Sequence, residues 1–305
     1  MNCIDLQVNG YRGVDFNGDQ LSPEEMHEVC ARLKEDGVVS FLPTVITDSI
    51  SAMTSRLQHL VRLREQDPLV AQVVGGLHIE GPFLNETSGY IGAHPVDHAC
   101  PASIDNMQQL LDAANGLTRI VTLAPERDAG SRVTRMLADA GICVSAGHCD
   151  PTLDQLKSGI DAGLRMFTHL GNGCPLEMHR HDNIIQRVLH LSDQLWISFI
   201  GDGHHVPAFT LLNYLSRTGF ERCVLVTDAI AAAGLGPGRF QVGSQTFLVG
   251  EDGVPRTGDG KYFAGSGATI PQMIRFAREG LGLADAEVEL LTSTNPRRIL
   301  EEARG

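Results

Sequence analysis

The sequence predicts an α/β protein built as a (β/α)8 barrel of the TIM type. Eight short apolar runs lie along the chain, and nearly every run is followed by a segment of helical character, which is the alternation of a parallel α/β barrel. The length of 305 residues suits one such barrel or two smaller domains. A doubly wound open sheet is the alternative, but it usually carries a Gly-rich phosphate loop after its first strand. No Gly-x-Gly-x-x-Gly motif follows the first apolar run here.

The predicted strands are short apolar runs that end at glycine, proline or a polar residue, as buried strands do. In chain order they cover residues 4–8, 38–42, 73–79, 119–123, 142–146, 164–168, 195–200 and 222–227. Pro43 is expected to stop the second strand. Gly81 and Pro82 are expected to stop the third, which places Glu80 at its carboxyl end.

The first helix has the clearest start signal. Ser22 can cap it, Pro23 suits its first position, and Glu25 stands three residues after the serine. Further helices are expected over 50–66, 103–115, 130–140, 151–162, 182–190, 207–218, 267–280 and 284–303. Residues 239–263 are expected to form a β-hairpin excursion from the barrel, with its turn at 251–253.

Composition and charge narrow the class of protein. The formal net charge of -13 argues against a nucleic-acid partner. No run of 18 apolar residues indicates a membrane span, and the first residues lack the pattern of a signal peptide. Seven scattered cysteines without a Cys-x-x-Cys motif suggest reduced thiols. Together these features predict a cytoplasmic protein that acts on a small molecule.

The carboxyl ends of the predicted strands carry residues that bind metals or move protons, and in a barrel these ends share one rim. They are Gln7, Asn9, Glu80, His148, His169, His204 or His205, and Asp228. Two histidines and one carboxylate with an open fourth position form a catalytic zinc set. Each residue alone has a structural alternative, such as helix capping by Asp228. Gathered on one rim, however, these groups would be costly to bury without a metal or a substrate.

The chain also carries a series of motifs that occur together, and in this order, in one known family. They are Asp5-Leu6-Gln7-Val8-Asn9-Gly10, Phe41-Leu42-Pro43-Thr44, Gly76-Leu77-His78-Ile79-Glu80-Gly81-Pro82-Phe83-Leu84-Asn85, Gly92-Ala93-His94-Pro95, Val121-Thr122-Leu123-Ala124-Pro125-Glu126, Val144-Ser145-Ala146-Gly147-His148, Thr168-His169-Leu170, Asp202-Gly203-His204-His205-Val206 and Leu225-Val226-Thr227-Asp228-Ala229. From about residue 4 to about residue 300, the chain resembles N-acetylglucosamine-6-phosphate deacetylases of the amidohydrolase superfamily.

The resemblance implies a role for each matching residue. Asp228 matches the catalytic acid/base, and His94 matches the histidine that polarises the amide carbonyl. The matching metal ligands are Glu80, His148 and His169, and the matching substrate contacts are His205, Asn172, Gly173 and Arg180. The implied reaction is hydrolysis of a linear amide, which would release acetate from N-acetylglucosamine 6-phosphate. The implied cofactor is one divalent ion per subunit, zinc in the first place, although such ligands also accept iron or cobalt. Because some members lend the equivalent of Arg180 across a dimer interface, a homodimer is expected.

The chain departs from the family pattern at three places. Gln7 and Asn9 stand where many amidohydrolases bind a second metal through His-x-His, so a one-metal site is expected. Residues 171–182 differ from the usual Tyr-Asn-Ala-Met-Pro and Gly-Arg sequences. The family's small β-sandwich is expected to be missing, which leaves 1–305 as a single metal-dependent hydrolase barrel. A deacetylase of another N-acyl amino sugar or small amide, or a non-catalytic zinc-binding protein, stays open as an alternative.

Overall fold

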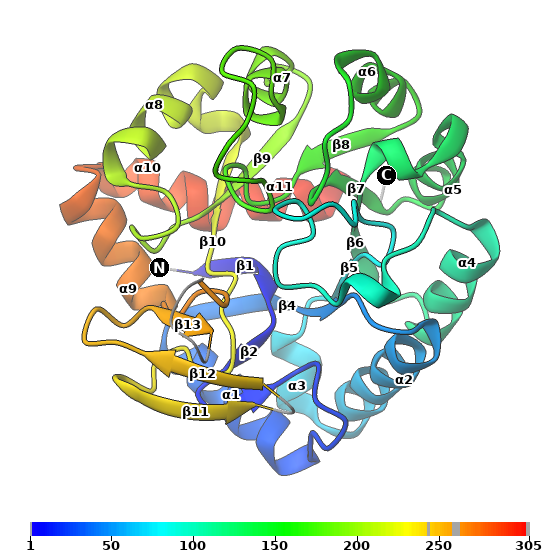
Figure 1. Ribbon diagram of the computed structural model, residues 1–305. Coiled ribbons are helices and arrows are strands. Elements are labelled where there is room, and N and C mark those ends of the chain that lie inside the picture. The colour runs from blue at the N-terminus through cyan, green and yellow to red at the C-terminus, as the bar shows by residue number, and fades with distance from the viewer. Residues whose placement is uncertain (1, 243–244, 258–262, 303–305) are drawn as a thin grey trace.

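The computed structural model describes residues 2–242, 245–257 and 263–302, and its centre is a nearly closed barrel of eight parallel strands (Figure 1). Neighbouring strands of the barrel follow one another along the chain. The strands are β1 (Cys3–Val8), β4 (Val38–Ile46), β5 (Leu77–Glu80), β6 (Thr118–Leu123), β7 (Cys143–Ala146), β8 (Leu164–Phe167), β9 (Trp196–Ile200) and β10 (Cys223–Val226). The predicted fold class is therefore confirmed.

The barrel closes between β1 and β10 with little backbone pairing. One parallel bridge joins Val8 to Ala229, and elsewhere the carboxylate of Asp5 takes the place of a ladder. Oδ1 of Asp5 accepts hydrogen bonds from the backbone N–H groups of Gln7 and Thr227, each at 3.3 Å, and Oδ2 accepts one from the Thr227 hydroxyl at 2.6 Å. A buried backbone N–H group needs an acceptor. The carboxylate of Asp5 therefore accepts hydrogen bonds that the carbonyl oxygens of a neighbouring strand would otherwise accept.

Helices surround the barrel (Figure 1). They are α1 (Pro23–Glu35), α2 (Ile50–Gln66), α3 (Pro68–Val73), α4 (Ile104–Ala113), α5 (Arg132–Asp139), α6 (Leu153–Asp161), α7 (Ile184–His190), α8 (Ala208–Thr218), α9 (Ile270–Arg275), α10 (Asp285–Glu289) and α11 (Asn295–Glu302). Wider π-type turns over Phe276–Gly280 and Leu290–Thr294 extend α9 and join α10 to α11. The predicted cap of α1 is present, because Ser22 accepts from the Glu25 backbone and Glu25 accepts from the Ser22 backbone.

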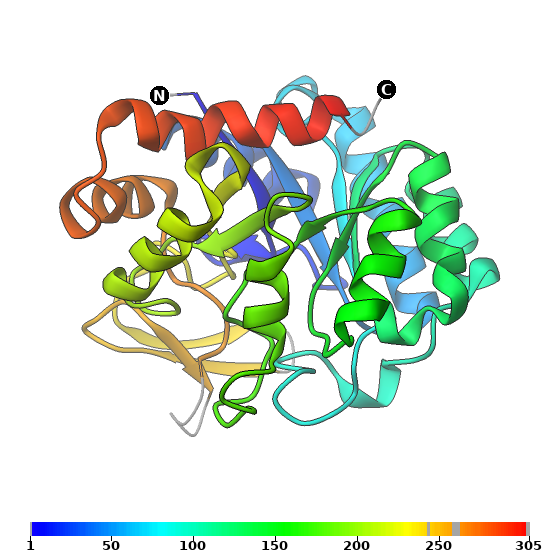
Figure 2. The same cartoon turned by 90° about the horizontal axis from the view of Figure 1, so that it is seen from above.

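The two ends of the barrel differ. Helix α11 lies along the amino end, and the long loops and a small sheet lie at the carboxyl end (Figure 2). Ile299 and Leu300 of α11 pack into a buried cluster with strand residues such as Leu6, Ile120 and Trp196. The indole N–H of Trp196 donates to Glu302 at 2.9 Å. Side chains of α11 and the strands therefore fill the amino end of the barrel, so a reaction site is expected at the carboxyl end.

Two predicted strand boundaries were wrong. Strand β4 runs through Pro43 to Ile46, because Thr44, Val45 and Ile46 pair with β5 and the Thr44 hydroxyl accepts the Val8 N–H at 3.1 Å. Strand β5 begins at Leu77 rather than at residue 73, because a short helix ends at Val73. Asp67 caps this helix and Pro68 opens it, a signal that was present in the sequence.

The excursion after β10 is a three-stranded antiparallel sheet made of β11 (Gly238–Val242), β12 (Gln245–Val249) and β13 (Pro255–Thr257). A second small pair, β2 (Gly10–Tyr11) and β3 (Val14–Asp15), follows β1. Among the residues that the structure describes, no β-sandwich is present. The described helices are all too short or too polar to cross a bilayer.

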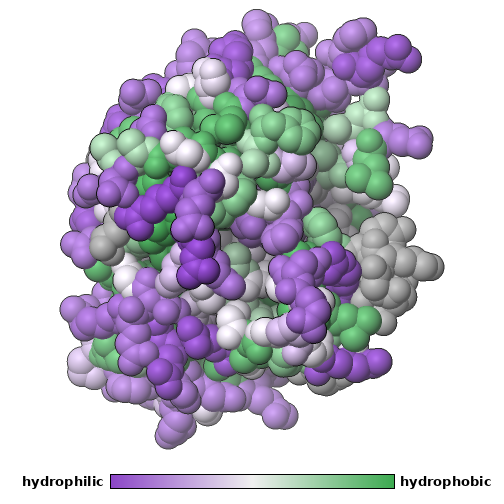
Figure 3. All heavy atoms as spheres, turned by 90° about the vertical axis from the view of Figure 1, so that its left-hand side faces the viewer, coloured by the Kyte–Doolittle hydropathy of each residue, from purple (hydrophilic) through white to green (hydrophobic). Residues whose placement is uncertain are grey.

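The side of the molecule that carries α8 shows hydrophobic side chains among polar ones in its upper half (Figure 3). On α8 itself, Phe209 is 72% exposed and Leu212 is 37% exposed. Leu176, in the loop between β8 and α7, is fully exposed. These apolar residues lie outside the core and are available for contact with another surface.

Candidate active site

The structure brings the three predicted metal ligands together inside the carboxyl end of the barrel. One ligand atom from each of Glu80, His148 and His169 lies within 4.8 Å of the other two, and all three side chains are buried. Oε1 of Glu80 lies 3.0 Å from Nε2 of His169 and 3.4 Å from Nε2 of His148, and the two Nε2 atoms are 3.2 Å apart. Two imidazole nitrogens and a carboxylate oxygen that converge on one point fit a divalent metal ion of the zinc class.

Three functional positions adopt a left-handed backbone conformation. His148, His169 and Asp228 have φ values of 50°, 38° and 50°, and each stands just beyond the end of its strand. Residues other than glycine rarely adopt this region, which costs about 1–2 kcal/mol per residue. The bend turns each side chain from the strand direction toward the barrel axis, so the strain is concentrated where the ligand atoms must meet.

The ring of His148 is fixed by the backbone of two loops. Its Nδ1 atom donates to the carbonyl oxygen of Tyr90 at 2.8 Å, which leaves the lone pair of Nε2 for a metal. A Cβ atom at Gly92 would lie 3.0 Å from the ring, and one at Gly173 would lie 2.8 Å from Nδ1. Gly173, expected to contact substrate, therefore also packs against a metal ligand.

Gln7 and Asn9 were not expected to bind metal, and the structure shows what they contact instead. The amide nitrogen of Gln7 donates to both carboxylate oxygens of Glu80, at 3.1 and 3.2 Å. Burial opposes ionisation of Glu80, but the hydrogen bonds and charges of the histidines outweigh it and hold its pKa well below the ordinary value. Glu80 is thus an ionised side chain that Gln7 orients as a candidate metal ligand.

Asp228 lies beside the metal group, and Asn9 orients it. The amide nitrogen of Asn9 donates to Oδ1 of Asp228 at 2.7 Å. Burial raises the pKa of Asp228 to about 6, and the negative charge of Glu80 acts in the same direction. A carboxyl group with a pKa near neutrality can both accept and return a proton at working pH.

His94 also reaches the group, from the long loop after β5. Its Nε2 atom lies 3.8 Å from Oε2 of Glu80, and its ring meets that of His148 edge-on with centroids 4.4 Å apart. Nδ1 of His94 lies 2.9 Å from the hydroxyl oxygen of Thr47. Burial lowers the pKa of His94 to about 3, so the imidazole is neutral at physiological pH.

The residues predicted to contact substrate differ in their surroundings. Nδ1 of His205 lies 2.6 Å from Oδ2 of Asp202, which stands three residues earlier in the chain. The Phe263 ring lies against His205, with centroids 5.1 Å apart. Asn172 follows His169 and donates twice to its carbonyl oxygen. Arg180 is exposed, and among the described residues it has no hydrogen-bond or ion-pair contact with the metal group.

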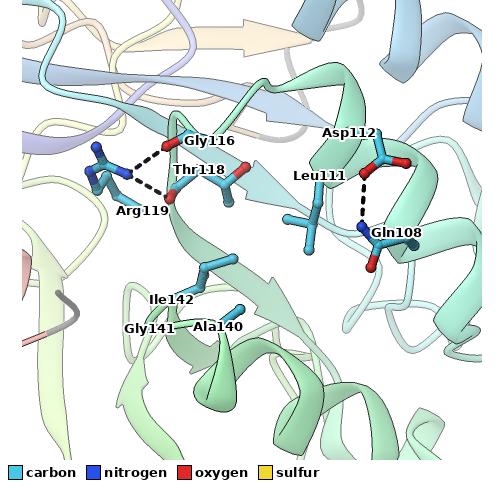
Figure 4. A pocket seen from close by; sticks show the side chains of 9 residues that line it. All are labelled: Gln108, Leu111, Asp112, Gly116, Thr118, Arg119, Ala140, Gly141 and Ile142. Atoms are coloured by element: carbon cyan, nitrogen blue, oxygen red, sulfur yellow. Dashed lines mark hydrogen bonds between the residues drawn. The ribbon is translucent and has the colours of Figure 1, made fainter. Parts of the chain in front are cut away.

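A separate cleft of about 380 Å³ lies at the amino ends of β6 and β7 (Figure 4). Several of its polar groups are paired locally: Arg119 donates to the carbonyl oxygens of Gly116 and Thr118, and Gln108 donates to Asp112. None of the predicted site residues lines it. The chemistry is therefore assigned to the carboxyl end of the barrel.

Comparison with known proteins identifies the family of the chain. The chain is 35% identical over 318 residues to human N-acetylglucosamine-6-phosphate deacetylase, an alignment that covers 99% of the chain and 75% of the relative. It is 31% identical over 299 residues to Escherichia coli N-acetylgalactosamine-6-phosphate deacetylase, covering 97% and 76%. The chain belongs to the N-acetylglucosamine-6-phosphate deacetylase family. No family model matched it.

Solved structures of N-acetylglucosamine-6-phosphate deacetylases share the fold. The Thermotoga maritima enzyme matches with a TM-score of 0.85 and 28% identity, over 98% of this chain and 78% of that one. A variant of the Mycobacterium smegmatis enzyme, solved in complex with N-acetyl-D-glucosamine-6-phosphate, matches with a TM-score of 0.86 and 28% identity, over 98% and 77%. The family and enzyme class expected from the sequence, an amidohydrolase deacetylase, are thereby confirmed. The chain spans about three quarters of the length of these relatives.

Proposed function

We propose that the protein removes the acetyl group from N-acetylglucosamine 6-phosphate and releases glucosamine 6-phosphate and acetate. The observation that supports it most is the buried convergence of Glu80, His148 and His169 beside Asp228 in a member of this deacetylase family. These three residues would hold one divalent ion, with zinc favoured by the nitrogen-rich ligand set and iron or cobalt also acceptable. Residues 1–305 would work as a single hydrolase barrel.

The chain's own groups have distinct parts in the proposed mechanism. A divalent ion held by Glu80, His148 and His169 would supply Lewis acidity and would lower the pKa of a water molecule bound there to about 7. Asp228, oriented by Asn9, accepts the proton of the attacking water and later returns it to the departing amine. His94 donates a hydrogen bond to the acetyl carbonyl oxygen, where negative charge develops. The buried position of both side chains excludes bulk water from these transfers.

Four residues are proposed to hold the sugar phosphate: His205, Asn172, Gly173 and Arg180. Arg180 is exposed and free to reach a neighbouring subunit's site, which requires a homodimer. The exposed apolar residues Leu176 and Phe209 support contact between subunits. The seven cysteines, all among the described residues, form no disulfide, which suits the proposed cytosolic location.

A second candidate substrate is N-acetylgalactosamine 6-phosphate. The identity of 31% to the Escherichia coli enzyme that acts on it is close to the identities with N-acetylglucosamine-6-phosphate deacetylases. The two sugars differ only in the configuration of one hydroxyl group, and the conserved chemistry at the acetyl group does not separate them. Another N-acyl amino sugar is the wider alternative.

The test is acetate release by zinc-loaded protein from three substrates: the two phosphorylated sugars and plain N-acetylglucosamine. The expected result is the highest kcat/KM for N-acetylglucosamine 6-phosphate and a much lower value without the phosphate. A higher value for the galacto sugar would transfer the assignment to that substrate. Zinc-replete protein that hydrolyses none of them would favour a non-catalytic zinc protein.

A further inference from the structure

We propose that Thr47 is a positioning residue for the reaction, whose hydroxyl group holds the ring of His94 and determines which of its nitrogens carries the hydrogen. This inference rests on the proposed function, in which His94 donates to the substrate carbonyl. Thr47 was not identified from the sequence. It follows β4 directly, about thirty residues before the metal ligand of β5, and nothing in its local sequence suggests a site.

The geometry places the Thr47 hydroxyl at the junction of three segments. Its oxygen lies 2.9 Å from Nδ1 of His94 and 3.2 Å from the backbone carbonyl oxygen of Glu80. A Cβ atom on Gly81 would lie 2.0 Å from the same oxygen, so the absence of a side chain at Gly81 makes room for it. Thr47 is 1% exposed. No other side chain among the described residues hydrogen-bonds to the His94 ring.

The tautomer of His94 follows from what faces each nitrogen. A neutral imidazole carries one hydrogen, and the other nitrogen is an acceptor. Nε2 faces the ionised carboxylate of Glu80, at 3.8 Å from Oε2, and a nearby negative charge favours the hydrogen on that nitrogen. The Thr47 hydroxyl acts in the same direction, because it donates its single hydrogen to Nδ1 at 2.9 Å rather than to the carbonyl oxygen of Glu80 at 3.2 Å, and this keeps Nδ1 an acceptor. The result is an Nε2–H group directed into the site, which is the donor that a carbonyl oxygen requires.

Three substitutions separate this role from simple packing. Thr47→Val keeps the shape and removes the hydroxyl, whereas Thr47→Ser keeps the hydroxyl. Thr118→Val is the matched control, because Thr118 is a buried threonine of β6 whose hydroxyl has no partner among the described residues. We expect Thr47→Val to lower kcat roughly 10- to 100-fold while KM and zinc content change little. Thr47→Ser should recover most of the rate, and Thr118→Val should retain it.

A second measurement reports on the ring without any substrate. Side-chain ¹⁵N spectra of zinc-loaded, ¹⁵N-histidine-labelled protein distinguish the Nε2–H tautomer from the Nδ1–H tautomer, and the His94 signal is identified by its loss in His94→Asn. The wild type should show Nε2–H for His94, and Thr47→Val should lose that preference while Thr47→Ser keeps it.

Either of two results would overturn the proposal: an Nδ1–H tautomer in the wild type, or a zinc-replete Thr47→Val protein with the wild-type tautomer. The first needs no variant to fold. If the wild type hydrolyses no amino-sugar substrate, the proposed function fails, and the spectra still decide the role of Thr47.

Discussion

At the scale of single residues, the site is built from side chains whose neighbours determine their chemistry. The same residue type has different partners: a backbone carbonyl holds His148, the proposed metal ligand, and a hydroxyl group holds His94, the proposed hydrogen-bond donor. His78, also buried, is hydrogen-bonded through both nitrogens, to Leu6 and Thr122, and is structural. Only contacts that are distant in sequence separate these three roles.

Replacing Asp228 by Asn tests the proton-transfer role. Asparagine keeps the shape but cannot accept the water proton, so turnover should fall by roughly 10²–10⁴ while zinc binding persists. The measurement is acetate release alongside zinc content. Asp139→Asn, an exposed change on α5, is the control. An Asp228→Asn enzyme with nearly wild-type turnover would refute the role.

A methyl group at Gly173 should disturb the metal centre. The Cβ atom would lie 2.8 Å from Nδ1 of His148, so Gly173→Ala must displace either the loop or the ligand ring. We expect the zinc affinity, measured by competition with a chelator, to fall roughly 10- to 100-fold. Gly282→Ala is the matched control, because Gly282 also has a positive φ, of 69°, but has open space around it. Equal zinc affinities in the two variants would show that the contact has no effect.

At the scale of secondary structure elements, β1 holds together three parts of the site. Asp5 joins β1 to β10 at the barrel seam, Gln7 orients the carboxylate of Glu80 on β5, and Asn9 orients Asp228 after β10. A strand that supplies no metal ligand to the group therefore positions a ligand and the proton-transfer residue. The seam itself combines the buried carboxyl group of Asp5 with the few backbone hydrogen bonds around the bridge between Val8 and Ala229.

The seam should make stability depend on pH. Burial raises the pKa of Asp5 to about 7, well above its value of about 3.9 in an unfolded chain. Between these two pH values Asp5 is protonated in the native state and ionised in the unfolded chain. Its contribution to the free energy of unfolding is therefore fully present below about pH 4 and is lost as the pH rises through 7. Urea unfolding at pH 5 and pH 8 should show a larger decrease for the wild type than for Asp5→Asn. The difference is at most about 1.4 kcal/mol per pH unit. Parallel pH profiles for the two proteins would contradict this account.

At the scale of the whole molecule, the two ends of the barrel differ: apolar packing is found at one end and the candidate site at the other. The amino end is closed by α11 and its apolar cluster, while the carboxyl end gathers polar residues from strands far apart in the chain. Loops that approach His148 from two directions complete the site. A metal ion bound by Glu80, His148 and His169 would therefore also cross-link the end of β5 to the segments that follow β7 and β8.

Removing the metal should consequently lower thermal stability. A ligand at 100 times its Kd stabilises the native state by about 2.7 kcal/mol, which corresponds to several degrees in Tm for a domain of this size. We expect chelator treatment to lower Tm and added zinc to restore it. Glu80→Gln, which lacks the carboxylate ligand, should show a much smaller response to zinc. A wild-type Tm that ignores both treatments would argue against a metal in this group.

The sequence by itself determined the fold class, all eight barrel strands and the family. Periodicity and the residues that interrupt it are local properties, and the motifs around Glu80, His148 and His169 are short and contiguous. The strand boundaries that were predicted wrongly also depend on local features. Pro43 did not stop β4, because pairing with β5 continued past it, and the capped helix at Pro68 was not predicted.

Only the tertiary structure decided how the candidate site is held. The amides of Gln7 and Asn9, the hydroxyl of Thr47 and the packing of Gly173 each act on a partner brought near by the closure of the barrel or the folding of a loop. Local sequence carries no record of such partners, because the distance between them depends on the strand order and on the backbone bends at the rim. The physical reason is that side-chain chemistry is set by neighbours in space, and a barrel makes neighbours of residues such as Asp5 and Thr227, which are 222 positions apart.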